Sequence, residues 1–251
     1  MSSLFSLEGR TALVTGARTG LGAAIAAGFA GAGADLVLLG HGGDFSLVCK
    51  EIETFGRRAT VVEVDLGEPE AVPAAAREIL AEHRIDVLVN NAGIIRRGAA
   101  VDHSTEDWNA VRAVNLDSVV ELTSVIAGPM VERRAGKIIN VASVLSFQGG
   151  IRVAGYTATK HALAGLTKAW ANEWAPHNVQ VNAIAPGYFH TDNTAPLRAD
   201  PERYQQILDR IPAGRWGEPA DLVGAAIFLA SAASDYLNGH ILVVDGGWLA
   251  R

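Results

Sequence analysis

Short runs of β-branched and aliphatic residues recur along the chain, separated by segments in which glycine, asparagine, aspartate and proline are common. The first run, TALVT at residues 11–15, has the residue types that favour a β-strand. Six further runs follow it. The pattern predicts seven strands, at residues 11–15, 35–39, 59–64, 85–89, 137–141, 179–184 and 238–244.

Longer segments of helical character lie between these runs, beginning with an alanine-rich one. Helices are predicted at residues 23–32, 51–55, 69–83, 108–130 and 154–174. Strands that alternate with helices form parallel βαβ units with right-handed connections. Residues 1–251 are therefore predicted to form a single doubly wound α/β domain, with a seven-stranded parallel sheet and helices on both faces. One long irregular region, residues 188–216, is expected to form a substrate loop.

The composition suits a folded domain, because 49% of the residues are hydrophobic and 19% are charged. A formal net charge of -6 disfavours general attraction to nucleic acid or to an anionic membrane. The single cysteine, Cys49, excludes an internal disulfide and a cysteine-rich metal site, and it fits a reducing compartment. With no basic leader and no apolar run of about 18 residues, we expect a soluble, cytoplasmic protein.

A glycine-rich turn lies between the first predicted strand and the first predicted helix. Glycine lets the backbone come close to a pyrophosphate, and the free N–H groups and dipole at the start of a helix favour its negative charge. Strand, turn and helix together therefore indicate a dinucleotide site. The cofactor contacts predicted in this turn are Gly16, Arg18, Thr19, Gly20, Leu21 and Gly22.

The second predicted strand should end beside the adenosine ribose, where an acidic residue is typical of NAD enzymes and a basic residue of NADP enzymes. After Gly40 the sequence offers His41, which is mostly uncharged at neutral pH, and Asp44, which lies further along. Arg18 in the glycine turn either meets a 2′-phosphate or is simply exposed. Because no basic pair follows the strand, the sequence favours NAD.

Small and polar residues follow the third and fourth predicted strands. They lie at the carboxyl ends of these strands, where ligands bind in an open α/β sheet. Asp65 and Leu66 come after the third strand, and Asp65 either accepts a hydrogen bond from the adenine amino group or caps the following turn. Asn91, Ala92 and Gly93 come after the fourth strand. Their small size allows a ligand to approach closely.

Four polar residues further along are candidates for catalysis. Ser143 follows the fifth strand, and Asn115 lies in an apolar helix, where its side chain needs a backbone group or a water as a partner. Tyr156 and Lys160 are four residues apart in a predicted helix, so their side chains share one face. A cation within ~4–6 Å lowers the pKa of a tyrosine by roughly 1–3 units, towards the range in which it can transfer a proton.

Together these motifs resemble the short-chain dehydrogenase/reductase family over nearly all of the chain. The motifs are Thr15-Gly16-x-x-x-Gly20-x-Gly22, Asp65, Asn90-Asn91-Ala92-Gly93, Asn115, Ser143, Tyr156-x-x-x-Lys160 and Pro186-Gly187. The resemblance implies a Rossmann domain and a nicotinamide cofactor, NAD or NADP. It also implies an oxidoreductase that interconverts an alcohol and a ketone.

The resemblance further implies a role for each catalytic candidate. Tyr156 would be the acid/base, and Lys160 would lower its pKa and bond the nicotinamide ribose. Ser143 would hold the substrate oxygen, and Asn115 would support a water that links Lys160 to solvent. Further cofactor contacts are implied at Pro186, Gly187 and Thr191.

Several segments that usually vary within the family resemble members that act on sugar acids: residues 91–97, 145–153, 171–174, 208–216 and 245–251. A sugar acid is an anion, so its site should supply a cation or bidentate donors. Arg152 with Gln148 is the first prediction for these contacts, and Arg96 or Arg97 is the second. Ser143 and Tyr156 complete the predicted substrate set.

The apolar tail at Trp248 and Leu249 is expected to pack on another subunit of a homotetramer, as members of the family allow. Two other functions remain open. An NADPH-linked 3-oxoacyl carrier-protein or general ketone reductase would need a basic patch for its acidic carrier, and residues 188–216 offer no obvious one. A non-catalytic Rossmann binding or regulatory protein would be favoured by loss of Ser143, Tyr156 or Lys160, and all three are present.

Overall fold

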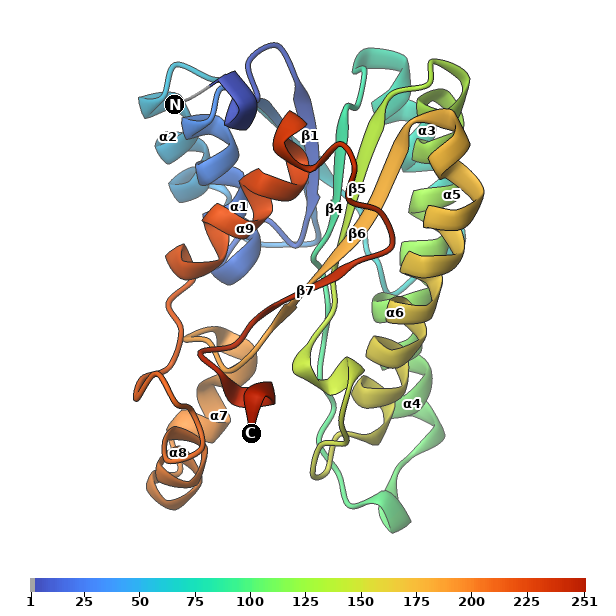
Figure 1. Ribbon diagram of the computed structural model, residues 1–251. Helices are drawn as coiled ribbons and strands as arrows, with labels where there is room; N and C mark the ends of the chain where they lie inside the picture. Colours follow the sequence, from blue (N-terminus) through green and yellow to red (C-terminus); the bar gives the residue numbers. More distant parts are fainter. Residues whose placement is uncertain (1–2) are drawn as a thin grey trace.

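A computed structural model describes residues 3–251 and contains one parallel sheet of seven strands in the order β3-β2-β1-β4-β5-β6-β7 (Figure 1). The strands are β1 (Thr11–Thr15), β2 (Asp35–Gly40), β3 (Ala59–Glu63), β4 (Val87–Asn90), β5 (Gly136–Val141), β6 (Val179–Pro186) and β7 (Ile241–Val244). Each predicted strand is present, with its ends within three residues of the prediction. The predicted fold class, a doubly wound α/β domain, is confirmed.

The strand order reverses between β1 and β4, which lie side by side although they are not consecutive in sequence. In open parallel sheets the connections leave a crevice at such a point, outside the carboxyl ends of the strands. The neighbouring strands are in register through Val14 and Val89, so the turns that follow them lie close together. This topology positions the candidate site.

Helices cover both faces of the sheet (Figure 1). One face carries α1 (Gly20–Gly31), α2 (Ser46–Thr54) and α9 (Ala220–Ala230), and the other carries α3 (Val72–Glu82), α5 (Ser118–Glu132) and α6 (Ala154–Trp174). Fully buried side chains fill each interface, such as Phe29 on the first face and Ile126 on the second. Burial of one such side chain contributes roughly 1.5–3 kcal/mol.

The long helix predicted at residues 108–130 is interrupted. Residues Thr105–Arg112 form α4, a π-helical turn follows at Ala113–Asp117, and α5 continues to Glu132. The combined stretch Thr105–Glu132 is long and apolar enough to cross a membrane by length and composition, since one 18-residue window in it has a mean hydropathy of 1.2. Its inner face, however, packs on α3 and on the sheet, which explains why it is apolar.

The prediction that residues 188–216 are irregular throughout is wrong, because they contain α7 (Ala195–Arg198) and α8 (Pro201–Leu208). The residues that suggested a loop start a helix instead. The side chain of Asp200 accepts a hydrogen bond from the backbone N–H of Arg203 at 3.1 Å, and Pro201 occupies the first helical position. Helix α9 was also not predicted.

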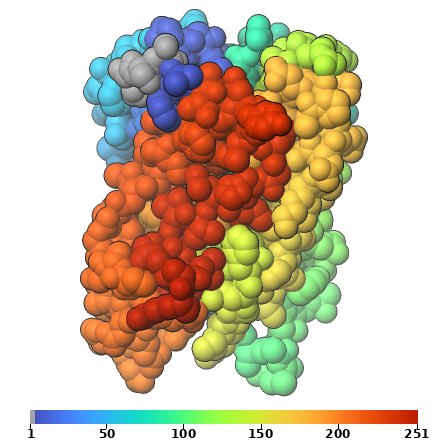
Figure 2. Space-filling model, viewed as in Figure 1, coloured from blue at the N-terminus to red at the C-terminus, as the bar shows by residue number. Residues whose placement is uncertain are grey.

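The C-terminal residues form a short 3-10 turn at Trp248–Ala250 that packs on residues 188–216 of the same chain. Trp248 is only 3% exposed within the single chain. In Figure 2 these residues, dark red, lie between the orange region that includes α8 and the yellow-green region near residue 147. The prediction that Trp248 packs on another subunit is therefore wrong.

Candidate active site

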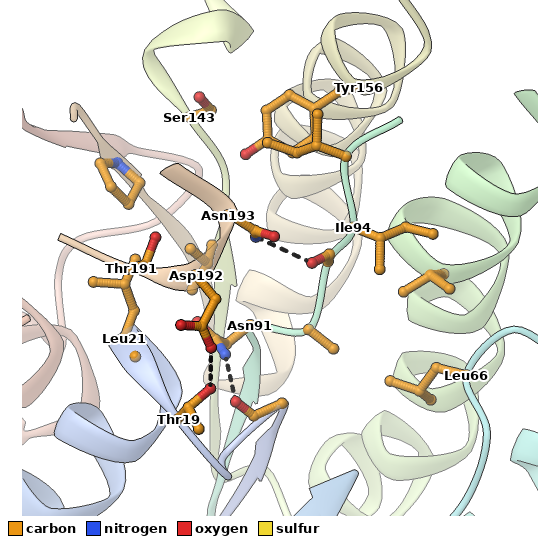
Figure 3. A pocket seen from close by; sticks show the side chains of 18 of the residues that line it. Thr19, Leu21, Leu66, Asn91, Ile94, Ser143, Tyr156, Thr191, Asp192 and Asn193 are labelled. Atoms are coloured by element: carbon orange, nitrogen blue, oxygen red, sulfur yellow. Dashed lines mark hydrogen bonds between the residues drawn. The ribbon is translucent and has the colours of Figure 1, made fainter. Parts of the chain in front are cut away.

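A cavity of about 470 Å³ lies at the carboxyl ends of β1, β4, β5 and β6. Predicted residues that line it are Gly16, Thr19, Gly20, Leu21, Asp65, Leu66, Asn91, Ala92, Gly93, Ser143, Tyr156, Lys160, Pro186, Gly187 and Thr191. Figure 3 shows the catalytic candidates Ser143 and Tyr156 at one end of the view and Thr19 of the glycine turn at the other. Predicted residues outside this lining are Arg18, Gly22, Asn115, Arg96, Arg97, Gln148 and Arg152.

The glycine turn has no room for side chains. A Cβ atom at Gly22 would lie 2.3 Å from the carbonyl oxygen of Gly16 and 2.5 Å from the side-chain nitrogen of Asn91. Gly16 itself has a φ of +62°, a conformation that favours glycine. Helix α1 then begins at Gly20 with its N–H groups towards the cavity end of the turn. The turn therefore fits a pyrophosphate, which requires a close backbone and free N–H donors.

Thr15, at the end of β1, ties the glycine turn to the turn after β4. Its buried hydroxyl accepts hydrogen bonds from the backbone N–H groups of Asn91 at 2.9 Å and Ala92 at 3.0 Å. The Asn91 side chain donates in return to the carbonyl oxygens of Thr15 at 2.9 Å and Gly16 at 3.2 Å. These bonds hold together the two walls of the cavity. Thr15 is part of the family motif, but the sequence alone indicated no role for it.

The end of β2 carries no carboxylate aimed at the cavity. Asp44 uses both carboxylate oxygens on Ser46, with distances of 2.8 Å to its backbone nitrogen and 2.8 Å to its hydroxyl. Arg18 is exposed and lies over Gly43, since a Cβ there would be 2.9 Å from its Cδ atom. Asp65 accepts a hydrogen bond from the backbone of Gly67 at 2.7 Å, so it caps its turn while also lining the cavity.

Asn115 lies in the π-helical turn and is only 1% exposed. Its side-chain oxygen accepts a hydrogen bond from the backbone N–H of Ile94 at 2.8 Å, and its nitrogen donates to the carbonyl oxygen of the same residue at 3.0 Å. The sequence left open whether this side chain bonds a backbone group or a water, and the structure shows that it bonds a backbone group. Asn115 thereby fixes the strand-like segment that runs past Gly93, and π-helical turns are frequent at functional sites.

Tyr156 and Ser143 come from different elements and meet at the cavity (Figure 3). Ser143 ends the turn after β5, and its buried hydroxyl accepts a hydrogen bond from the backbone of Leu145 at 3.1 Å. Burial raises the pKa of Tyr156, and the Ser143 hydroxyl and the Arg97 charge partly offset this effect. The phenol is therefore protonated at neutral pH and can donate a proton.

Lys160 lies one turn along α6 from Tyr156 and is 3% exposed. Its Nζ atom lies 5.5 Å from the centre of the Tyr156 ring and donates a hydrogen bond to the carbonyl oxygen of Val141 at 2.5 Å. Burial lowers the pKa of the ammonium group to about 8. The helical spacing predicted for this pair is present, although Lys160 is not among the groups that set the pKa of Tyr156 in this structure.

Arg97, the second choice of the sequence analysis together with Arg96, is the arginine whose charge acts on the phenol of Tyr156. It is half-buried and donates a hydrogen bond to the carbonyl oxygen of Asn193 at 2.8 Å, and Asn193 lines the cavity. Burial lowers the pKa of Arg97, and the phenols of Tyr156 and Tyr188 raise it. The guanidinium group stays charged at any physiological pH.

The other predicted substrate residues lie elsewhere. Arg152 is exposed and has a φ of +63°, so it stands in a loop before α6 rather than one helical turn ahead of Tyr156. The Gln148 side chain accepts a hydrogen bond from Arg210 at 3.1 Å. Arg96 is exposed and lies 3.7 Å from the carboxylate of Asp107. The structure brings none of the three into the cavity.

The segment after β6 crosses the cavity and is attached on both sides (Figure 3). Thr19 of the glycine turn donates a hydrogen bond to the carboxylate of Asp192 at 3.3 Å, and Asn193 donates to the carbonyl oxygen of Gly93 at 3.3 Å. The Arg97 bond adds a third attachment. The arrangement encloses a site that contains a glycine turn for a dinucleotide, a protonated phenol and a serine hydroxyl, and the guanidinium group of Arg97 is bonded to the crossing segment.

The chain belongs to the short-chain dehydrogenase/reductase family, whose members are NAD(P)-dependent oxidoreductases that act on CH–OH groups. A family model described as enoyl-(acyl carrier protein) reductase matches residues 16–249. Most of the motif residues that suggested the family line the cavity, among them Gly16, Asn91, Ser143, Tyr156 and Lys160.

Relatives are similar over nearly their whole length. The 2-dehydro-3-deoxy-D-gluconate 5-dehydrogenase of Bacillus subtilis (strain 168) is 56% identical over 247 residues, 98% of this chain and 97% of that protein. The Escherichia coli (strain K12) protein of the same name is 51% identical and covers 99% of both chains. A structure from Agrobacterium tumefaciens, described as a 2-deoxy-D-gluconate 3-dehydrogenase with bound NADP, is 52% identical with a TM-score of 0.94 and 100% coverage of both chains.

Proposed function

We propose that this chain interconverts 2-dehydro-3-deoxy-D-gluconate and its 2,5-diketo form, a step in the breakdown of pectin-derived uronates. The similarity to the Bacillus subtilis and Escherichia coli relatives supports this substrate. The observation within the structure that carries the proposal is Arg97, a half-buried guanidinium group beside the candidate acid/base Tyr156. A carboxylate is the partner that such a group prefers. A neutral ketone would leave it without an anionic partner.

Each catalytic residue has a proposed task that agrees with its surroundings. The nicotinamide cofactor supplies the hydride chemistry at the carbinol carbon. Tyr156 transfers the proton at the adjoining oxygen, which Ser143 holds by a hydrogen bond. Lys160, buried one helical turn from Tyr156, bonds the nicotinamide ribose. Asn115 fixes the Gly93 segment and supports the route by which Lys160 exchanges protons with solvent.

The test of the substrate is turnover followed at the NADH or NADPH absorbance band. Purified protein should reduce or oxidise the cofactor with 2-dehydro-3-deoxy-D-gluconate, and with neutral polyols of the same length the rate should be far lower. A carboxylate that meets a half-buried guanidinium is worth roughly 1.5–3 kcal/mol, or about 10- to 100-fold in kcat/KM. Turnover with neutral polyols alone would overturn the sugar-acid proposal.

We further propose that the cofactor site accepts NADP(H) as well as NAD(H). The preference for NAD expected from the sequence gains no support, because a 52% identical structure contains NADP. Within this chain, Asp44 is engaged with Ser46 and no other carboxylate follows β2 to bond a ribose 2′-hydroxyl. Arg18 lies over the same loop and offers a cation to a 2′-phosphate.

Substitution of Arg18 by alanine is the corresponding prediction. The Kd of NADPH, measured by fluorescence titration, should rise about tenfold, because an exposed charge-assisted contact contributes about 1.4 kcal/mol. The Kd of NADH should stay within twofold. Arg58→Ala is the matched control, since Arg58 is exposed and paired with Asp35 at the opposite end of the sheet. Equal losses for both cofactors would refute the role of Arg18.

The homotetramer and the cytoplasmic location remain proposals. Trp248 no longer supports the homotetramer, since it is buried in its own chain. Sedimentation of the purified protein tests the oligomeric state directly.

A further inference from the structure

The end of the chain is attached to the substrate-loop region by contacts that the proposed chemistry does not use. The carboxylate of Asp245 accepts hydrogen bonds from the backbone N–H groups of Gly247 and Leu249, each at 2.8 Å. The carbonyl oxygen of Gly246 accepts one from Ala213 at 2.9 Å. A Cβ atom at Gly247 would lie 2.9 Å from the Pro212 side chain, so only glycine permits this approach. The turn delivers Trp248 to a defined position.

Trp248 lies between the end of α8 and Tyr188, the second residue after β6. Its ring centre is 4.6 Å from that of Tyr188, and the guanidinium carbon of Arg210 lies 4.0 Å from the ring centre on its face. The indole nitrogen of Trp248 is buried without a hydrogen-bond partner among residues 3–251. The ring is therefore held by packing and by the cation above it. Arg251 adds hydrogen bonds to the backbone carbonyl oxygens of Asp209 and Arg210.

Tyr188 connects this cluster to the active site. It directly follows Pro186 and Gly187, which line the cavity, and its ring also contacts Trp216, with ring centres 5.6 Å apart. Burial raises the pKa of Tyr188, and nearby arginines, including Arg97, lower it. The segment that contains Tyr188 therefore leads from this cluster into the cavity, where its neighbours Gly187 and Phe189 lie. Aromatic contacts fix the place of Tyr188.

Arg210 extends the same cluster to the loop before α6. Its guanidinium group covers Trp248 and also donates a hydrogen bond to Gln148 at 3.1 Å. Gln148 thus contacts the substrate-loop region rather than the cavity, and it helps to set the distance between α8 and the segment that leads to Tyr156.

We propose that Trp248 is a positioning residue for the sugar-acid reaction: it holds Tyr188 in place, and with it Gly187 and Phe189, the two neighbours of Tyr188 that line the cavity. The proposal rests on the proposed function for its substrate. It gives a role to the sequence Asp245-Gly246-Gly247-Trp248, which has no part in the proposed reaction itself. Trp248 also packs on Ile207 and Trp216 of the region expected to hold the substrate. Loss of Trp248 should therefore affect substrate binding more than cofactor binding.

The test compares Trp248→Ala and Trp248→Phe with Trp108→Ala, a control at a half-exposed tryptophan of α4. For Trp248→Ala we expect the KM for 2-dehydro-3-deoxy-D-gluconate to rise at least tenfold, with kcat reduced less than threefold and the Kd of NADPH within twofold. The phenylalanine variant should restore most of the affinity, because a ring still packs on Tyr188. The control should keep the wild-type KM.

Trypsin cleavage gives a second readout that does not depend on the substrate. Residues 198, 203 and 210 are arginines within the substrate-loop region, and cleavage there should become at least fivefold faster in Trp248→Ala, with the circular dichroism spectrum unchanged. An unchanged cleavage rate and KM in a folded Trp248→Ala protein would overturn the positioning role. Wild-type protein without turnover of the sugar acid would instead refute the proposed function, and the cleavage result would still decide the role of Trp248.

Discussion

Substitution of Tyr156 by phenylalanine should reduce kcat by about 10²- to 10⁴-fold, the range that a positioned proton donor contributes. The phenol meets Ser143 at the cavity, and burial raises its pKa, so the native side chain carries the proton at neutral pH. Phenylalanine fills the same space and removes only the hydroxyl. The Kd of NADPH should therefore stay within about twofold, and the whole loss should fall on the chemical step.

Tyr236→Phe is the matched control for this experiment, because Tyr236 is fully exposed and lies outside the cavity lining. Steady-state rates of both variants with the sugar acid, together with cofactor titrations, separate loss of chemistry from loss of binding. A Tyr156→Phe protein that turned over at nearly the wild-type rate would show that another group transfers the proton.

Much of the site could be predicted from local patterns, because its residues follow strands at one edge of a parallel sheet. The turns that contain Gly16 and Asn91 must meet once β1 and β4 are neighbours, and Tyr156 and Lys160 are paired by helical spacing alone. These inferences need only the strand order and the geometry of a helix. They do not depend on how the loops fold.

The rest depends on tertiary contacts that no periodicity reveals. Arg152 was preferred because it precedes Tyr156 by four residues, but α6 begins at Ala154, so the helical spacing does not apply. Arg97 comes from the segment after β4 and bonds the carbonyl oxygen of Asn193 beside the cavity, and only the folded chain shows it. Helix α8 was not predicted because its start is formed by Asp200 and Pro201, and aspartate and proline occur both in loops and at helix starts.

Substitution of Arg97 by alanine should raise the KM for 2-dehydro-3-deoxy-D-gluconate by roughly 10- to 100-fold, since a charge-assisted hydrogen bond to a carboxylate contributes about 1.5–3 kcal/mol. Lysine at this position keeps the charge but cannot form a bidentate contact, so Arg97→Lys should lie between alanine and the wild type. Initial rates over a range of substrate concentrations measure both effects.

The adjacent Arg96 provides the control, because it has the same charge, is exposed and lies near Asp107 instead of the phenols. Arg96→Ala should leave the KM within twofold. A neutral ketone or polyol substrate adds a sharper comparison. Arg97→Ala should keep most of the wild-type activity on such a molecule while it loses activity on the sugar acid, so the ratio of the two activities should fall. If both substrates lost activity equally, Arg97 would act through its bond to Asn193 and the segment that crosses the cavity, and the carboxylate would require another partner.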